Sequence, residues 1–386
     1  MRQSEVLEIV YRAAAGNSII CPICMDHVGS DKHYKMCQEC GQPAHTFCLQ
    51  KWFDTTDKES CPACRSTFYA HDNPLINELT SSWVNLEKLE KTLADKKTKG
   101  FVNQMVNSRT ALMQACGYNQ GSGGDGGGDT CSSWIVGRLL VAGADVNLSN
   151  RLRRTALMCA SETGRPTTAQ ALIDAGACVD YADVNGWTAL MLACQEGHDQ
   201  CALQLIEAKA NVDHAAVDGS TALMAACREG RDQCALQLIK ANADVDHAEQ
   251  VDDQTALMLA CRNGHDRVAL QLIEAKANVD KATQEGATAL MFACQEGHDQ
   301  CVLQMINAKA NVDKTDENGI TGLMVACTYG HDACVLQLIN AKANVDHAAV
   351  DGSTALMAAY KNGHDACEQL LTFRTVQPAQ NINNSR

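Results

Sequence analysis

The sequence lacks three features that would assign it to a membrane, a secretory or a nucleic-acid-binding class. No stretch approaches the roughly 20 apolar residues that a membrane-spanning helix needs. We expect no signal peptide, because Glu5 and Glu8 interrupt the apolar part of the first residues. The third missing feature is a positive net charge: the value is −14, which argues against nucleic acid as the main partner, because phosphate binding needs clustered Lys and Arg. We therefore expect an acidic protein of the cytoplasm, the nucleus or both, with neither nucleic acid nor membrane among its partners.

Disulfides are not expected either, although the chain has 21 cysteines. In a reducing compartment cysteines ligate metal or pack as small apolar side chains. Here they fall into two groups, seven between residues 21 and 64 and fourteen after residue 115. The first group predicts metal binding, and the second predicts core packing.

The chain divides into five segments. We expect the first segment to form a short amphipathic helix and the second to form a zinc domain. The third is expected to be a helical linker with leucines at helical spacing, the fourth a repeat array and the fifth a disordered tail. Their expected bounds are 1–17, 18–70, 71–104, 105–374 and 375–386.

The repeat array is marked by the tetrapeptide TALM, which once reads TGLM. From Thr155 onward successive copies start 33 residues apart, except for one step of 34 where HAEQVDDQT carries an extra residue. Each unit predicts a short helix, a second helix and a turn-rich return, as in residues 188–220. Helices this short bury their apolar faces only by stacking on neighbouring units. The first unit is interrupted by the Gly-rich run 117–133, which we expect to be a flexible loop.

The array resembles the ankyrin repeat over about two thirds of the chain, in about eight units. The family's TPLHxA appears as TALMxA, its helix junction as GHD and its unit end as ANVD. The resemblance implies an all-α solenoid that binds a partner protein. One departure is Met in place of the family's His, at Met113, Met158, Met191 and their equivalents, so the bonds that this His makes between repeats are expected to be missing and packing must compensate.

A second departure concerns the ends of the second helices. Where the family usually has Gly, this sequence has Lys209, Asn242, Lys276, Lys309 and Lys342. If these residues adopt the left-handed conformation, each costs on the order of 1 kcal/mol.

The N-terminal cysteines form a metal-ligand pattern. Three C-x-x-C pairs and one H-x-x-C pair supply eight potential ligands within residues 21–64. Two such pairs can hold one tetrahedral zinc ion, so the pattern predicts two Zn2+. The segment has few apolar side chains for its length, and metal must then supply much of its folding free energy.

Eight ligands in this order resemble the cross-braced RING and PHD families, whose small domains are α+β. The resemblance implies one zinc on Cys21, Cys24, His45 and Cys48, and a second on Cys37, Cys40, Cys61 and Cys64. Histidine as the fifth ligand is the PHD order, and it also occurs in RING variants. The ligand order alone therefore leaves the two families open.

The residues between the ligands favour RING. RING ubiquitin ligases dock a conjugating enzyme through an apolar residue in the first knuckle, a Trp after the sixth ligand and Pro in the last knuckle, and here these are Ile23, Trp52 and Pro62. The resemblance also assigns Arg65, just after the eighth ligand, the catalytic task of bridging the conjugating enzyme and ubiquitin. Each side chain could instead serve only the small domain's own packing or surface.

In the array, Tyr181 and Trp187 stand out in an otherwise uniform series of turns and are candidates for partner binding. Repeat motifs such as CQEGHDQC, residues 194–201, look like metal sites, but other units lack the His or a Cys, so we expect core packing.

The combination predicts a ubiquitin ligase whose RING recruits a ubiquitin-loaded conjugating enzyme and whose repeats bind the substrate protein. Two alternatives remain open, a non-enzymatic adaptor with a structural zinc domain and a PHD-type histone reader.

Overall fold

The computed structural model describes residues 34–36, 43–45, 75, 79, 86–94, 101–105, 109–117 and 127–375. The chain forms two compact units, residues 1–151 and 152–386. The helix expected at residues 1–17, most of the zinc domain and residues 376–386 of the expected tail lie outside the described ranges.

Two short strands are described within the predicted zinc domain. Strand β1 (Tyr34–Met36) pairs antiparallel with β2 (Pro43–His45). The register places Tyr34 opposite His45 and Met36 opposite Pro43. The two strands therefore flank the six residues of sequence that carry Cys37 and Cys40.

The predicted linker contains helix α4 (Leu86–Ala94). Leu75, Leu79 and Leu89, three of the leucines that suggested a helix with one apolar face, are fully buried. Helix α4 contacts α6 (Gly127–Val141), and Glu90 pairs with Arg138 at 3.0 Å. These three leucines agree with the packed face that the spacing predicted, while Leu93 of α4 is only half-buried.

The first repeat unit consists of α5 (Ala111–Cys116) and α6, which pack on each other. The expected loop 117–133 is shorter than predicted, because its last part is helical from Gly127. Ile135, Val136 and Leu139 of α6 are buried, and the packing of this face favours a helix that glycine propensity alone would not.

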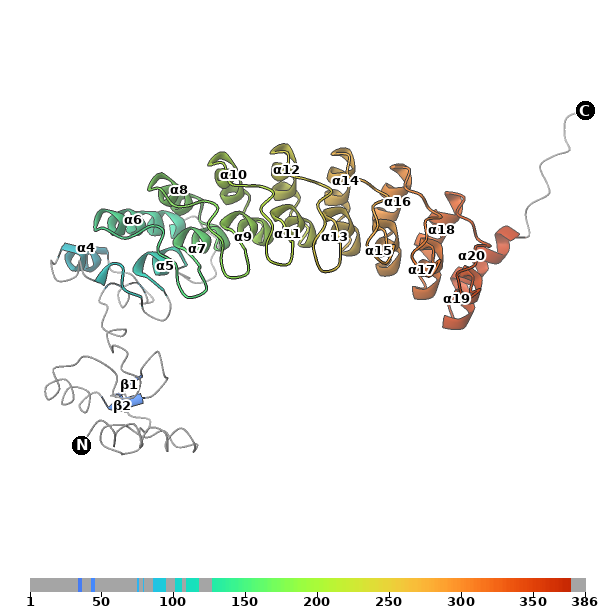
Figure 1. Ribbon diagram of the computed structural model, residues 1–386, viewed down its shortest axis with the longest axis horizontal. Coiled ribbons are helices and arrows are strands. Elements are labelled where there is room, and N and C mark those ends of the chain that lie inside the picture. Colours follow the sequence, from blue (N-terminus) through green and yellow to red (C-terminus); the bar gives the residue numbers. More distant parts are fainter. Residues whose placement is uncertain are drawn as a thin grey trace, which may run out of the picture. The chain divides into compact units, whose positions relative to one another are not determined.

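The second unit of the fold is a stack of seven helix pairs within residues 152–375, drawn from green to red in Figure 1. The first helices of the pairs pack on one another in one row, and the second helices form another row. The first helices are α7 (Ala156–Glu162), α9 (Ala189–Glu196), α11 (Ala222–Arg228), α13 (Ala256–Arg262), α15 (Ala289–Glu296), α17 (Gly322–Tyr329) and α19 (Ala355–Asn362). The second helices are α8 (Pro166–Asp174), α10 (Asp199–Glu207), α12 (Asp232–Lys240), α14 (Asp266–Glu274), α16 (Asp299–Asn307), α18 (Asp332–Asn340) and α20 (Asp365–Thr375).

The TALM motif begins each first helix for a local reason. Its Thr is the N-cap, and the hydroxyl accepts a hydrogen bond from the backbone N–H of the Met three residues later, as in Thr188 with Met191 at 3.4 Å. Gly197 then ends α9 in the left-handed conformation with φ 81°. The predicted helix, Gly stop and second helix of residues 188–208 are therefore confirmed.

The core lies between the two rows of helices. In α9 every residue from Ala189 to Cys194 is buried, and α10 buries Cys201, Ala202 and Leu205 against it. The corresponding Met side chains of the earlier repeats are buried as well, for example Met158, Met191 and Met224, whereas Met357 of the last repeat is exposed. Among the described residues, no helix is both long and apolar enough to cross a membrane.

The five non-Gly residues at the ends of the second helices adopt the left-handed conformation. Lys209, Asn242, Lys276, Lys309 and Lys342 have φ between 62° and 70°. Gly143 and Gly176 occupy the equivalent position in the two earlier units, with φ 95° and 86°. Five repeats therefore carry a backbone strain that the first two avoid.

Packing is not the only interaction that holds neighbouring repeats together. A different His, that of the GHD junction, bridges the units: the Nε2 of His198 donates to the backbone oxygen of Glu162 at 3.0 Å. In a second series, an Asp carboxylate accepts a hydrogen bond from a backbone N–H of the next repeat. Asp180 Oδ1, for example, accepts from Asn211 N at 2.8 Å. Met at the family's His position thus removes one set of bonds while others remain.

Candidate functional site

Two places on this chain are candidate sites: the predicted zinc domain and the surface formed by the repeat loops. Of the eight predicted zinc ligands, only His45 falls on a described residue, at the end of β2. The other seven, and the docking candidates Ile23, Trp52, Pro62 and Arg65, lie outside the described residues. The donor set itself is suited to zinc, because thiolate and imidazole are the ligands of tetrahedral structural zinc sites.

Most of the described repeat cysteines pack in the core. In the part of the chain that the structure describes, no group of three or more His, Cys, Asp or Glu is placed to hold a metal. Eleven of the thirteen described cysteines are buried, while Cys159 is half-buried and Cys178 exposed. Burial raises the pKa of the Cys327 and Cys334 thiols to about 12, so both stay protonated at neutral pH. The prediction of core packing is confirmed.

Tyr181 and Trp187 both lie in the loop before α9 and are half-buried. The Arg153 guanidinium lies over the Tyr181 ring at 5.2 Å from its centroid. Trp187 is held by its backbone, whose N–H donates to Asp183 Oδ1 at 2.9 Å. Both aromatics therefore remain partly accessible on a loop that is fixed by its own hydrogen bonds.

The repeat loops project as short hairpins, which we call fingers. In each, the N–H of the first residue donates to the C=O of the last, as from Ala216 to Ser220 at 2.9 Å. The fingers comprise residues 183–187, 216–220, 249–254, 283–287, 316–320 and 349–353. The third is one residue longer than the others, which accounts for the single 34-residue step in the sequence.

Neighbouring fingers are joined by backbone hydrogen bonds that form a ladder. Val217 N donates to Asn185 O, Gln250 N to Asp218 O, Glu317 N to Glu285 O and Val350 N to Asn318 O, each at 2.9 Å. The equivalent bond from Gln284 N to the preceding finger is absent from the described structure. The ladder is therefore interrupted once, directly after the long finger.

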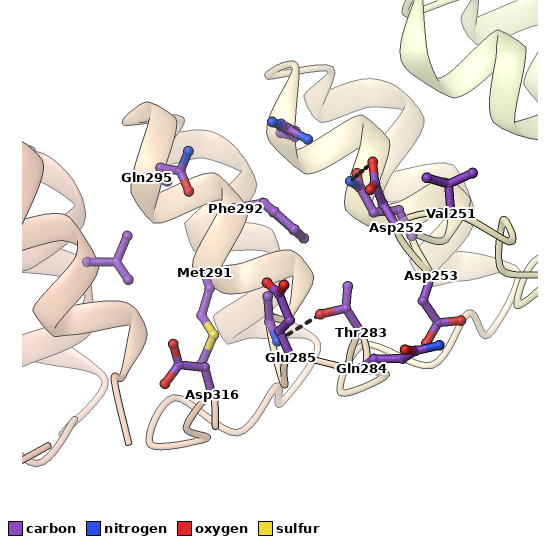
Figure 2. Close-up of a pocket in the computed structure, with 14 residues that line it drawn as sticks. Val251, Asp252, Asp253, Thr283, Gln284, Glu285, Met291, Phe292, Gln295 and Asp316 are labelled. Carbon is purple, nitrogen blue, oxygen red and sulfur yellow. Dashed lines mark hydrogen bonds between the residues drawn. The ribbon is translucent and has the colours of Figure 1, made fainter. Parts of the chain in front are cut away.

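A pocket of about 480 Å3 lies at this interruption. It is lined by the fingers 249–254 and 283–287, by side chains of α13, α15 and α17, and by Asp316 (Figure 2). Its wall includes Met291 and Phe292 of α15 and Arg262 of α13, whose guanidinium lies 5.6 Å from the centroid of the Phe292 ring. Sequence reasoning noted the extra residue but did not find this pocket, for which the 34-residue step was the available signal.

Comparisons with known proteins agree with both parts of this description. A family model described as ankyrin repeats (3 copies) matches residues 129–216, 185–249, 204–284, 223–316 and 290–383. A model described as Ring finger domain matches residues 19–65. Since the first set of matches spans about two thirds of the chain, the protein belongs to the ankyrin-repeat family, and it carries a RING finger at its N-terminal end.

Individual relatives match each part separately. The crystal structure of the human ASB11 ankyrin repeat domain aligns with a TM-score of 0.53 and 29% identity, covering 58% of this chain and 100% of that one. The E3 ubiquitin-protein ligase listerin of Neurospora crassa is 44% identical over 48 residues, which is 12% of this chain and 3% of listerin. The probable E3 ubiquitin-protein ligase RHA1A of Arabidopsis thaliana is 33% identical over 48 residues, covering 12% of this chain and 30% of that protein.

The ligase matches bear on the zinc domain alone, because the listerin matches cover only 12–13% of this chain, and this chain spans about 3% of the length of the listerins. The Ring finger match decides between the RING and PHD families, which the ligand order had left open. A RING finger is a zinc-binding domain, so zinc is the metal of the N-terminal cysteines.

Proposed function

We propose that this protein is a RING-type ubiquitin ligase, whose RING finger docks a ubiquitin-loaded conjugating enzyme and whose ankyrin repeats bind the substrate protein. The observation that carries the proposal is the match of residues 19–65 to the Ring finger model and to segments of proteins named as ubiquitin ligases. The repeat array, a rigid scaffold with exposed fingers, supplies a surface of the kind that binds proteins.

The zinc ligands hold the docking surface in shape. We assign Cys21, Cys24, His45 and Cys48 to one ion, and Cys37, Cys40, Cys61 and Cys64 to the second. Zinc acts structurally here, because four protein ligands leave no open coordination position for a reactant. In sequence, β1 lies between the first and second ligand pairs, and β2 ends at His45, the first ligand of the third pair.

The docking side chains have distinct tasks. Ile23 and Trp52 supply apolar contact to the conjugating enzyme, and Pro62 limits the freedom of the last knuckle. Arg65 would donate hydrogen bonds to both the conjugating enzyme and ubiquitin, since its planar guanidinium presents several donors at once.

The ligase needs no nucleophile of its own. The lysine of the substrate attacks the thioester that links ubiquitin to the conjugating enzyme, and the thiol of that enzyme is the leaving group. Holding ubiquitin in one orientation raises the rate, because reactants that are already aligned do not lose that freedom in the transition state. On the repeats, Tyr181 and Trp187 are candidate contacts for the substrate.

The test is ubiquitin-chain formation by the full chain with ubiquitin, ATP, activating enzyme and a panel of conjugating enzymes. Ile23→Ala and Arg65→Ala are each expected to lower the rate by about tenfold or more, because they remove docking and orientation contacts. Arg267→Ala is the matched control, since the Arg267 side chain is 82% exposed and lies on α14 of the array.

Zinc content is measured for every variant, so that loss of activity is not mistaken for loss of the fold. Unchanged rates in both Ile23→Ala and Arg65→Ala would show that the docking assignment is wrong. Absence of chain formation with every conjugating enzyme would favour the non-enzymatic adaptor.

A further inference from the structure

The regular fingers pack closely on one another, and the gap between the fingers 249–254 and 283–287 is a departure from this packing. A Cβ added to Gly219 would lie 2.5 Å from Gln250 N, and one added to Gly286 would lie 2.8 Å from Asp316 Cα. Contacts this short are excluded by van der Waals repulsion, so glycine at this position lets the next finger approach. The regular ladder therefore depends on glycine near each finger tip.

The long finger breaks this rule. Asp253 stands where the other fingers have glycine, and it adopts φ 54°. A Cβ at this position and the extra residue distinguish this finger from the regular ones. In the described structure Gln284 N and Asp252 O make no hydrogen bond to each other or to another backbone group. A donor and an acceptor are thus left at the edge of the pocket.

The pocket combines an apolar wall with an acidic rim. Figure 2 shows Phe292 extending from α15 into the space between Asp252 and Glu285. Met291 and Phe292 both belong to this wall, where Met291 is buried and Phe292 is half-buried. The four carboxylates that line the pocket are Asp252, Asp253, Glu285 and Asp316, whereas Arg262 is the only cation among the lining residues.

The acidic groups are short of cationic partners. No ion pair involves Asp252, Asp253 or Glu285 among the described residues. One carboxylate oxygen of Asp316 already has hydrogen-bond partners, because its Oδ1 accepts from the backbone N–H groups of Asn318 and Ile320 at 2.9 and 2.7 Å. The Arg262 charge faces the Phe292 ring. The lining therefore favours a positively charged ligand.

A buried amide points to the same ligand chemistry. Gln254 lines the pocket and is only 4% exposed. Its Nε2 makes a long hydrogen bond of 3.5 Å to Asp252 Oδ2, while its Oε1 has no hydrogen-bond partner. A buried carbonyl oxygen without a donor costs free energy, and a ligand that supplies an N–H group would remove that cost.

We propose that this pocket, formed by the long finger, is a specificity site for an extended segment of the partner protein that presents a Lys or Arg side chain. The alkyl stem lies against Phe292, the cationic head lies among Asp252, Asp253 and Glu285, and the segment's backbone pairs with Gln284 N–H and Asp252 C=O. The volume of about 480 Å3 is within the range of small-ligand pockets. The inference rests on the proposed role of the repeats in binding the substrate.

The test selects short peptides from a phage-displayed random library on the full-length protein and measures the binding of the selected peptides by fluorescence polarisation. A basic residue at one fixed position is expected in the selected peptides, and its replacement by norleucine should weaken binding by about tenfold or more. The triple variant Asp252→Asn, Asp253→Asn, Glu285→Gln should weaken binding similarly, because it removes three charges and keeps the shape.

Two further variants separate the pocket from the rest of the array. Deletion of Gln250 combined with Asp253→Gly converts the long finger to the regular length and restores glycine near its tip, so it should close the gap and abolish binding without loss of stability. Glu317→Gln is the matched control, since Glu317 is an exposed acid of the next finger outside the pocket lining, and it should bind as the unaltered protein does.

The inference is overturned if no peptide is selected, if the selected peptides share no basic residue, or if the triple variant or the shortened finger binds as tightly as the unaltered protein. Ubiquitin-chain formation is measured on the same samples without peptide. Peptide binding that depends on the pocket in a protein without ligase activity would overturn the proposed activity alone. Ligase activity without such peptide binding would overturn the pocket alone.

Discussion

The Nε of Arg231 lies 3.0 Å from the backbone oxygen of Gln195 in the preceding repeat. At five other junctions a histidine Nε2 makes the same bond at 2.9 to 3.1 Å, namely in His198, His265, His298, His331 and His364. Arg231 is thus a functional replacement for the junction His, although in sequence it only disrupts the GHD motif. Both side chains place an N–H group where the end of the preceding first helix offers a carbonyl.

We expect His and Arg to stabilise the repeat junction to a similar extent, because both donate the same hydrogen bond. His265→Ala should lower the free energy of unfolding by about 1 kcal/mol, because it leaves a backbone carbonyl without its donor. Arg231→Ala should have a similar effect, and Arg231→His should retain most of the stability. Urea unfolding followed by circular dichroism measures all three. A loss in Arg231→His as large as that in Arg231→Ala would contradict the equivalence of the two side chains.

Replacing a strained residue at a helix end with glycine should stabilise the protein. Lys276 has φ 70°, so Lys276→Gly is expected to raise the free energy of unfolding by about 0.5–1 kcal/mol, less the entropy that glycine adds to the unfolded chain. Thermal unfolding measures the change. Lys240→Gly, at the exposed end of α12, is the opposite control and should destabilise the protein. Equal effects at the two positions would show that Lys276 is not strained.

Glu249 should make stability depend on pH. Burial raises the pKa of its carboxyl above the ordinary value of 4.5, with Asp252 and Asp218 acting in the same direction, whereas Arg228 and Ser220 lower the pKa. The folded state therefore holds the proton more tightly than the unfolded state does. This contribution is fully present below pH 4.5 and is lost as the pH rises through the folded-state pKa.

The measurement compares the unaltered protein with Glu249→Gln from about pH 4 to pH 7. The variant keeps a hydrogen-bonding side chain beside Arg228, and its stability relative to the unaltered protein should increase as the pH rises. Parallel stability curves for Glu249→Gln and the unaltered protein would mean that the Glu249 pKa is not raised.

Zinc stoichiometry tests the ligand assignment independently of activity. Native mass spectrometry of the full chain is expected to show two zinc ions, and His45→Ala should lose one of them, because three ligands hold zinc less tightly than four. Chelation should unfold the zinc domain while leaving the far-UV helical signal of the repeats largely unchanged. A single zinc ion in the unaltered protein would contradict the two-site assignment.

The repeat architecture could be predicted because every local signal in it agrees. Thr188 caps a helix, Gly197 ends it and Leu205 of the second helix is buried, so period and local chemistry give the same answer. The helical start of α6 at Gly127 could not be predicted, because packing of Ile135 and Leu139 overrides a Gly-rich composition. The role of Arg231 was also missed, because a hydrogen bond to a backbone carbonyl depends on position and only weakly on residue type.

The candidate sites divide in the same way. A zinc-binding domain could be predicted from spacing alone, because two ligands separated by two residues can hold one tetrahedral ion, whereas the assignment of the eight individual ligands stays a prediction. The pocket beside Phe292 lies in the gap between the fingers 249–254 and 283–287. It could not be predicted, because no local sequence pattern describes the distance between segments that are 30 residues apart.

The interrupted finger ladder also has a consequence for how the array unfolds. A stack of repeats behaves as a one-dimensional chain in which cooperativity is carried by nearest-neighbour couplings. The junction between the fingers 249–254 and 283–287 lacks a backbone bond that its neighbours have, so it is a weak link in that chain. Helices α15–α20 would then open as a block that is partly independent of α7–α14, and hydrogen exchange would divide the array at this junction.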